Sequence, residues 1–166
     1  EAVFFAGKLD KDHLPKDTGA EVISIFIDSK IDKEVLEAFP NLKCIVMRST
    51  GFDHIDVQAC AERNIVVSNV PSYGEDTVAE YTFGLILALA RKIYRGFDQI
   101  RETGSFSLEG LRGIDLKGKT LGVIGTGKIG RNVVRIARGF EMNVIACDTS
   151  PDDEFAKEMN MTYCEP

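Results

Sequence analysis

The stretch that most constrains the fold lies between residues 120 and 148, where apolar runs flank a glycine-rich turn. The run "TLGVIG" (120–125) predicts a buried strand, and "NVIACD" (143–148) predicts a second one. Between them, "KIGRNVVRIARGF" (128–140) carries apolar residues at helical spacing. A strand, a turn, a helix and a strand in about thirty residues form one parallel βαβ unit. The sequence therefore predicts an α/β fold with a parallel sheet.

The three glycines of the turn have the spacing G-x-G-x-x-G. In a dinucleotide-binding unit the first glycine permits the sharp exit from the strand, the second lets the backbone approach a pyrophosphate, and the third lets helix and strand pack closely. The free amides at the start of the helix would point at the phosphates, with the helix dipole behind them. We therefore predict a dinucleotide site that comprises Gly125, Thr126, Gly127, Lys128, Ile129 and Gly130.

Asp148 follows Gly130 by 18 residues and ends the second strand. A carboxylate at this place accepts hydrogen bonds from the adenosine ribose of a dinucleotide. Its charge repels the additional phosphate of NADP, and the next residues, Thr149 and Ser150, provide no arginine to neutralise that phosphate. The predicted cofactor is therefore NAD. The alternative is an ordinary strand-to-helix turn with a structural aspartate.

Three arginines follow the turn on the predicted helix, at positions 131, 135 and 138. This i, i+4, i+7 spacing places them on one face of the helix. A solvated face is the simpler interpretation. Arg131 alone is near enough to the helix start to assist a phosphate.

The first 72 residues show short apolar runs that alternate with helix-like segments. This alternation is typical of a parallel sheet that is covered on both faces. The sequence predicts strands at 3–5, 21–27, 42–47 and 65–69, and helices at 32–39 and 56–64.

A long helix is predicted for residues 75–93, after the Pro- and Gly-containing segment "VPSYG". Ser72 or Asp76 is the expected cap. Apolar residues between Ala79 and Ala90 cover most of the circumference, which favours burial between domains or between subunits. The polar, glycine-containing stretch 97–119 is where we expect a domain boundary.

Composition narrows the class of function. Apolar residues make up 44% of the chain and charged residues 28%, as in soluble globular proteins. The net charge of −6 opposes binding to nucleic acid or to anionic membranes. The longest strongly apolar run, "GLILALA" (84–90), is too short to span a bilayer. We therefore expect a small-molecule partner, with neither nucleic acid nor membrane.

The cysteines and histidines do not form a metal-binding pattern. The four cysteines are widely spaced, without a C-x-x-C pair, and only two histidines accompany them: Cys44, Cys60, Cys147, Cys164, His13 and His54. We interpret the cysteines as reduced, mostly buried residues of a cytoplasmic protein, and we predict no metal site and no disulfide framework.

Three segments resemble one known family. They are "RSTGFDHID" (48–56), "SNVPSYGEDTVAEYTFGLILALARKI" (68–93) and "LKGKTLGVIGTGKIGRNVVRIARGFEMNVIACD" (116–148). The sequence is similar to the D-isomer-specific 2-hydroxyacid dehydrogenases. Tyr73 and the neighbouring "TVAEY" most resemble the D-lactate dehydrogenase branch.

The resemblance implies a domain organisation. Residues 1–72 would be a flavodoxin-like substrate domain that lacks its extreme N-terminus, and residues 73–111 would be linking and dimerisation helices. Residues 112–166 would then be the first half of a Rossmann, doubly wound NAD-binding domain. It also implies a homodimer through the helix at 75–93.

The resemblance further assigns site residues. Backbone amides of the loop at Thr50 and Gly51 would hold the substrate carboxylate, Tyr73 would touch the substrate, and Val78 would lie against the nicotinamide. Without the resemblance, "STGFD" would be an ordinary turn capped by Asp53, and Val78 a core residue.

Members of the family transfer a hydride between the cofactor and C2 of a 2-hydroxy or 2-keto acid. The resemblance to the D-lactate dehydrogenase branch implies D-lactate and pyruvate as the substrate pair. This chemistry needs a cation and an acid/base, which the family supplies as Arg, Glu and His later in the chain. Neither His13 nor His54 fits that role, so we expect no catalytic residue in this chain and no turnover by it alone. The alternative function is an NAD-sensing, co-repressor-like interaction protein on the same scaffold.

Overall fold

The computed structural model describes residues 2–165. The chain divides into two compact units, Glu1–Tyr73 and Gly74–Pro166, and each has its own parallel sheet and its own core. The expectation of an α/β fold with parallel sheets is confirmed.

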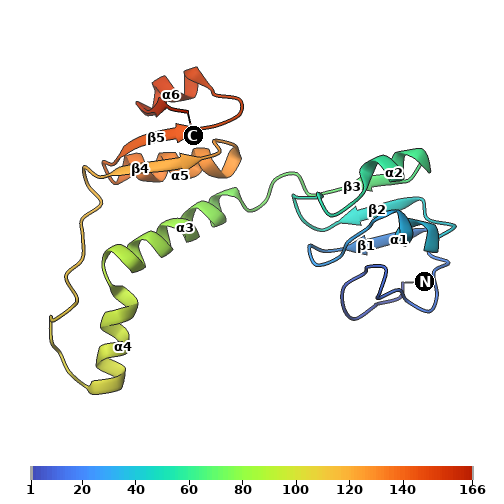
Figure 1. The fold of residues 1–166 in the computed structure, drawn as a ribbon, viewed down its shortest axis with the longest axis horizontal. Helices are drawn as coiled ribbons and strands as arrows, with labels where there is room; N and C mark the ends of the chain where they lie inside the picture. Colours follow the sequence, from blue (N-terminus) through green and yellow to red (C-terminus); the bar gives the residue numbers. More distant parts are fainter. Residues whose placement is uncertain (1, 166) are drawn as a thin grey trace. The chain divides into compact units, whose positions relative to one another are not determined.

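Unit 1 contains a three-stranded parallel sheet in the order β1-β2-β3 (Figure 1). Parallel neighbours need a crossover connection, and here each crossover contains a short helix. The elements are β1 (Val22–Ile25), α1 (Lys33–Ala38), β2 (Cys44–Met47), α2 (Val57–Glu62) and β3 (Val66–Ser68).

The two helices of unit 1 have six residues each, which is too short for stability without tertiary support. Aspartates cap both: Asp32 accepts a hydrogen bond from the Val35 amide, and Asp56 accepts one from the Ala59 amide. The guanidinium of Arg63 donates to the carbonyls of Leu36 and Phe39 at the end of α1. Caps and packing therefore stabilise helices that propensity alone would not.

Among the described residues of unit 1, only one face of this sheet is covered. Ile45 and Met47 point into the core, whereas Val22, Val46 and Val66 are 57%, 37% and 62% exposed on the other face. The expectation of cover on both faces is thus wrong for the described residues, because α1 and α2 pack against the same side.

The predicted strand at 3–5 is also wrong. These residues are irregular, and Phe4 is 96% exposed. The segment joins the core at Leu9 instead, whose amide donates to Ser29 Oγ and whose carbonyl accepts from the Lys30 amide. Apolar composition alone does not make a strand where no neighbouring strand offers hydrogen bonds.

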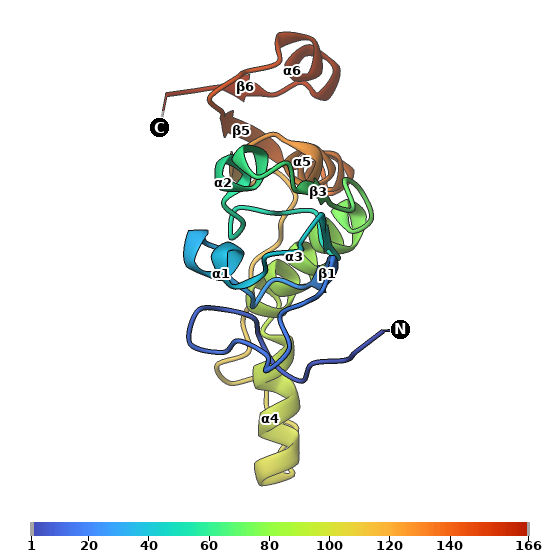
Figure 2. The ribbon, with the colours of Figure 1, turned by 90° about the vertical axis from the view of Figure 1, so that its right-hand side faces the viewer.

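Unit 2 contains a second parallel sheet in the order β4-β5-β6. Helix α5 connects β4 to β5, and helix α6 connects β5 to β6. Figure 2 shows both helices near β5 and β6. The elements are α3 (Glu75–Ala90), α4 (Ile93–Thr103), β4 (Thr120–Ile124), α5 (Lys128–Gly139), β5 (Asn143–Cys147), α6 (Asp153–Met159) and β6 (Thr162–Tyr163).

Helix α3 packs on α5, where the rings of Phe83 and Phe140 stack with centroids 5.4 Å apart. Its N-cap is Gly74, so the expected caps Ser72 and Asp76 are wrong. Ala79 and Phe83 are buried within unit 2, whereas Tyr81 is 69%, Leu85 51% and Leu89 62% exposed. Burial of this second face between domains or between subunits stays a prediction.

The helix predicted to end at residue 93 is two helices. Lys92 adopts a left-handed conformation with φ of 58°, which ends α3 and starts α4. Residues 97–103, which were expected in a polar connecting stretch, are therefore helical. The side chains of Ile93, Phe97 and Ile100 give α4 an exposed apolar face that the polar composition of the stretch concealed.

Candidate functional site

The glycine turn lies at the carboxyl end of β4. Gly125 has φ of +85°, a conformation that other L-residues rarely adopt, and its amide donates to the Cys147 carbonyl at 2.9 Å. Gly127 is the N-cap of α5 and has no side-chain capping bond. A β-carbon on Gly127 would meet nothing within 4 Å, so open space lies in front of the helix start.

Gly130 marks the close contact between helix and turn. A β-carbon there would overlap the Gly125 carbonyl oxygen and lie 3.0 Å from the Gly125 carbonyl carbon. The three glycines therefore serve different geometric needs: a left-handed conformation, an open helix start and a close backbone approach.

Asp148 stands on the neighbouring strand, immediately after β5. Its Oδ2 accepts from the Thr126 amide at 2.5 Å and from Thr126 Oγ1 at 2.9 Å, while its Oδ1 accepts from the Ser150 amide at 2.9 Å. Hydrogen bonds from the amides of Ser150 and Thr126, and then from the Thr126 hydroxyl, lower the pKa of Asp148 to about 2. The carboxylate is thus ionised and fixed beside the turn.

Tyr163 on β6 completes this cluster, and sequence reasoning missed it. Its hydroxyl lies 2.8 Å from Thr126 Oγ1. The two residues are 37 positions apart and belong to no common motif. The parallel register that pairs Ala146 with Tyr163 brings β6 next to the strand that carries Asp148.

Arg131 has structural partners. Its Nη2 lies 2.6 Å from Asp152 Oδ2, its Nε donates to the Thr126 carbonyl at 3.2 Å, and its guanidinium lies over the Phe155 ring. The amide of Phe155 and the Arg131 side chain lower the pKa of Asp152. Arg131 therefore links the turn to the N-cap of α6.

The other two arginines also contact the protein. Arg135 donates to Asn132 Oδ1, and Arg138 donates to the Met142 carbonyl at the end of α5. The interpretation of all three as a purely solvated face is therefore incomplete.

The first turn of α3 contacts the first turn of α5. Lys128 Nζ lies 3.7 Å from Glu75 Oε1, and Asn132 donates to Asp76 Oδ1 at 2.5 Å. Val78 follows in α3 and is 46% exposed. The start of α3 is thus attached to the glycine-turn helix within unit 2.

In unit 1 the proposed substrate loop follows β2. Thr50 and Gly51 are exposed, and the buried Ser49 hydroxyl donates to the Gly51 carbonyl at 3.0 Å. Asn69, just after β3, donates to the Thr50 carbonyl at 2.8 Å. This second strand end, which the sequence analysis did not single out, fixes the loop. Tyr73 is the last residue of unit 1 and is 64% exposed.

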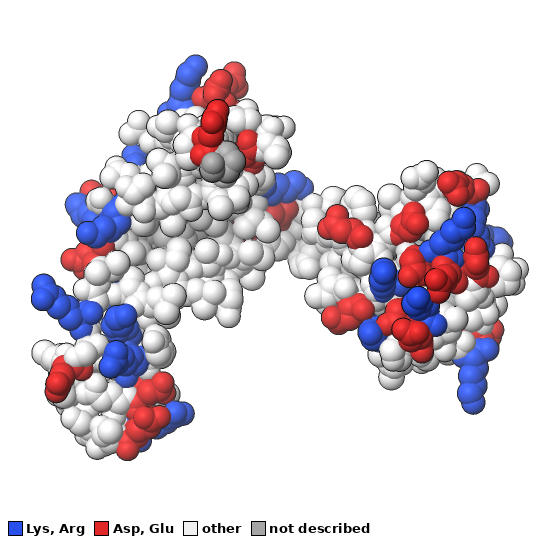
Figure 3. Space-filling view, viewed as in Figure 1, with Lys and Arg blue, Asp and Glu red and all other residues white. Residues whose placement is uncertain are grey.

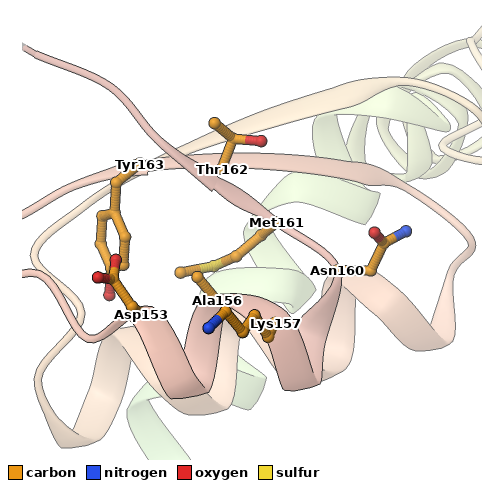
Figure 4. A pocket seen from close by; sticks show the side chains of 7 residues that line it. All are labelled: Asp153, Ala156, Lys157, Asn160, Met161, Thr162 and Tyr163. Atoms are coloured by element: carbon orange, nitrogen blue, oxygen red, sulfur yellow. The ribbon is translucent and has the colours of Figure 1, made fainter.

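A separate hollow lies between α6 and β6, and Figure 4 shows its lining side chains, among them Asp153, Lys157 and Tyr163. No residue of the glycine turn lines it. It is wide open to solvent, and it marks the edge of the sheet rather than the turn.

The residues considered for metals and redox chemistry are dispersed. Among residues 2–165 no group of three His, Cys, Asp or Glu side chains is placed to hold a metal ion. All four cysteines are free; Cys60 is buried, but Cys164 is exposed and Cys44 and Cys147 are half-buried, so "mostly buried" is wrong. His13 contacts Asp10, and His54 lies 3.2 Å from the sulfur of Met47.

Charge is mixed on the surface. On the face in Figure 3, Lys and Arg side chains are interspersed with Asp and Glu. Between residues 2 and 165, no helix combines the length and the apolar character that crossing a bilayer requires.

Comparison with known proteins decides the family. The model of the catalytic domain of D-isomer specific 2-hydroxyacid dehydrogenases matches residues 1–162. The chain belongs to this family. The resemblance drawn from the three sequence segments is thereby confirmed.

Individual members of the family agree. The chain is 40% identical over 166 residues to a 2-hydroxyacid dehydrogenase homolog of Zymomonas mobilis, covering 98% of this chain and 50% of that protein. It is 37% identical over 167 residues to D-lactate dehydrogenase of Escherichia coli, and the match covers 99% of this chain and 50% of that protein. The chain thus spans about half the length of these relatives.

A solved structure supports the same fold. D-lactate dehydrogenase from Aquifex aeolicus, complexed with NAD and lactic acid, superposes with a TM-score of 0.81 at 36% identity. The match covers 94% of this chain and 46% of that one.

Proposed function

We propose that this chain provides the NAD-binding turn and the substrate loop of an oxidoreductase that acts on D-2-hydroxy acids and 2-keto acids, with D-lactate and pyruvate as the favoured pair. The observation that carries the proposal is the junction of the Gly125–Gly130 turn with the fixed carboxylate of Asp148. The Aquifex relative, which was crystallised with NAD and lactic acid, supports the choice of cofactor and substrate.

The residues of the turn fit a dinucleotide. The first amides of an α-helix have no partner within the helix, so those of Ile129 and Gly130 in the first turn of α5 can face a pyrophosphate. The open space in front of Gly127 leaves room for it. The Asp148 carboxylate accepts from Thr126 and Ser150, with a further hydrogen bond from the Thr149 side chain, and it stays partly exposed, where a ribose hydroxyl can donate to it.

In the bound state NAD supplies the hydride acceptor or donor. We assign Val78 to the wall beside the nicotinamide, since its half-exposed side chain follows the turn of α3 that contacts α5. Lys128 and Ile129 start α5 and complete the phosphate site with Thr126.

For the substrate we assign the loop at Thr50 and Gly51, with Tyr73 as a contact. The bond from Asn69 and the bond from Ser49 hold the carbonyls of this loop, which leaves amides free to face a carboxylate. The domain assignment follows: residues 1–72 bind substrate, residues 73–111 link and dimerise, and residues 112–166 bind NAD.

We further propose that the isolated chain does not turn over substrate. Hydride transfer to a 2-keto acid needs a cation on the carboxylate and an acid/base near neutrality. His13 is bonded to Asp10 and His54 to Met47, both in unit 1, and we assign neither of them to that role.

The exposed apolar face of α3 supports a homodimer formed through residues 75–93. Tyr81, Leu85 and Leu89 are all more than half exposed, and such a row favours a protein interface. Light scattering on the protein with Leu85→Glu should show a monomer where the parent shows a dimer. A variant that stays dimeric contradicts this interface.

With reduced cysteines and a small-molecule substrate, we expect the protein in the cytoplasm.

The decisive experiment follows NADH absorbance while pyruvate and other 2-keto acids are added in turn. This chain and a version of it extended to the length of its relatives are measured side by side. Oxidation by the extended version alone supports the whole proposal, and oxidation by this chain overturns its inactivity. If neither oxidises NADH although both bind it, the NAD-sensing interaction protein becomes the better function.

A further inference from the structure

Three side chains from three separate strand ends form one hydrogen-bonded row beside the glycine turn. Tyr163 of β6 bonds to the hydroxyl of Thr126, and Thr126 bonds to the carboxylate of Asp148. Thr126 is only 4% exposed, so its hydroxyl has few partners other than these two. A buried hydroxyl of this kind is held in one orientation by its neighbours.

The direction of the bonds follows from counting protons. An ionised carboxylate only accepts, so Thr126 must use its single hydroxyl proton on Asp148. The contact of 2.8 Å to Tyr163 can then be a hydrogen bond only if the tyrosine donates. The row therefore runs in one direction, from the Tyr163 hydroxyl to the Thr126 hydroxyl and on to Asp148 Oδ2.

The carboxylate of Asp148 is held at both oxygens but stays partly exposed to solvent. Oδ2 accepts twice from Thr126, and Oδ1 accepts once from Ser150. The rotation of the carboxylate is thus fixed from both oxygens, and its solvent-facing lone pairs have a fixed direction. Such fixation before binding raises affinity for a ligand with a matching donor.

We propose that Tyr163 and Thr126 are positioning residues which orient the Asp148 carboxylate toward the adenosine ribose and thereby set the preference for NAD over NADP. This inference rests on the proposed NAD site and names residues outside the glycine pattern that determine its selectivity. A fixed carboxylate accepts from a ribose hydroxyl and opposes a phosphate at the same place. A carboxylate that is free to rotate loses the hydrogen bond from the ribose hydroxyl and can turn away from the additional phosphate of NADP. It therefore discriminates less between NAD and NADP.

The test measures the dissociation constants of NADH and NADPH by nicotinamide fluorescence on the full-length protein. Thr126→Val removes the hydroxyl but keeps the backbone amide bond to Asp148, and Tyr163→Phe removes only the donor at the start of the row. Thr126→Ser restores the hydroxyl. The matched controls are Thr162→Val, the exposed neighbour on β6, and Tyr94→Phe, exposed on α4.

We expect Thr126→Val to weaken NADH binding about 10-fold, since a hydrogen bond to a charged group is lost. Tyr163→Phe should weaken NADH binding about 3-fold. The dissociation constant of NADPH should change less than about 2-fold, so the preference for NADH over NADPH falls. Thr126→Ser should recover most of that preference. Both controls should leave the preference unchanged.

A second readout needs no nucleotide. The pKa of the Asp148 carboxyl, followed by carbon NMR, should be near its low parent value in the controls and should rise toward the ordinary value in Thr126→Val. Equal weakening of NADH and NADPH, or an unchanged Asp148 titration, overturns the positioning role alone. A parent protein that binds neither nucleotide overturns the proposed function, and this inference with it.

Discussion

Replacing Gly130 by alanine tests whether the close approach of α5 to the turn governs the stability of unit 2. The new β-carbon would overlap the Gly125 carbonyl oxygen, which is backbone and cannot rotate away, and would also lie 3.6 Å from Val123 Cγ1. Overpacking of this kind costs about 1–3 kcal/mol, and we take the upper end, about 3 kcal/mol, because backbone must move.

Alanine also gains helix propensity over glycine, by about 1 kcal/mol in a helix interior. The net loss is therefore about 2 kcal/mol. For a protein of this size, each kcal/mol lowers the melting temperature by about 2–4 °C, so we expect a decrease of about 4–8 °C. The same shift moves the turn, so NADH affinity should fall as well.

The assay is thermal unfolding followed by circular dichroism, with Gly139→Ala as the matched control. Gly139 ends the same helix, and a β-carbon there meets nothing within 4 Å. The control should be neutral or slightly more stable than the parent. If Gly130→Ala melts at the same temperature as Gly139→Ala, the close-approach argument is refuted.

Three further predictions concern the same region. Gly127→Ala should melt within about 2 °C of the parent, because its β-carbon meets open space, but should bind NADH at least about 10-fold more weakly by fluorescence titration. In Asp148 the folded pKa of about 2 is below the ordinary 3.8, so its contribution to stability is present above about pH 4 and is lost as the pH falls toward 2. The melting temperature of Asp148→Asn should therefore decrease less steeply than that of the parent as the pH falls from about 4 to about 2. Arg131→Gln should lower the melting temperature, by the loss of the Asp152 ion pair and the Phe155 contact, and should leave NADH affinity within about 3-fold by the same titration; a larger affinity loss would make Arg131 a phosphate ligand.

Much of the fold of unit 2 is predictable because its local demands are strong. The spacing of Gly125, Gly127 and Gly130 needs a strand before it and a helix after it, and the structure has β4 and α5 there. The place of Asp148 at the end of β5 follows from the same pattern. These residues encode geometry within about thirty positions, so a local reading suffices.

Contacts that depend on strand pairing are less accessible to a local reading. Tyr163 reaches Thr126 only because β6 pairs with β5, and Asn69 reaches Thr50 only because β3 pairs with β2. A polar residue at the end of each neighbouring strand is the available indication, since carboxyl ends of parallel strands share one edge. The cover of the exposed face of α3 is inaccessible for a related reason: apolar periodicity shows that a face is apolar, not what covers it.

The attachment of α3 to α5 has a mechanical consequence. The unit boundary falls between Tyr73 and Gly74, immediately before α3, and the Lys128–Glu75 and Asn132–Asp76 contacts fasten the first turn of α3 to the helix that begins at the glycine turn. Val78 and the first turn of α5 therefore belong to one compact unit, so the places that we assigned to the nicotinamide and to the pyrophosphate are held together by contacts within unit 2.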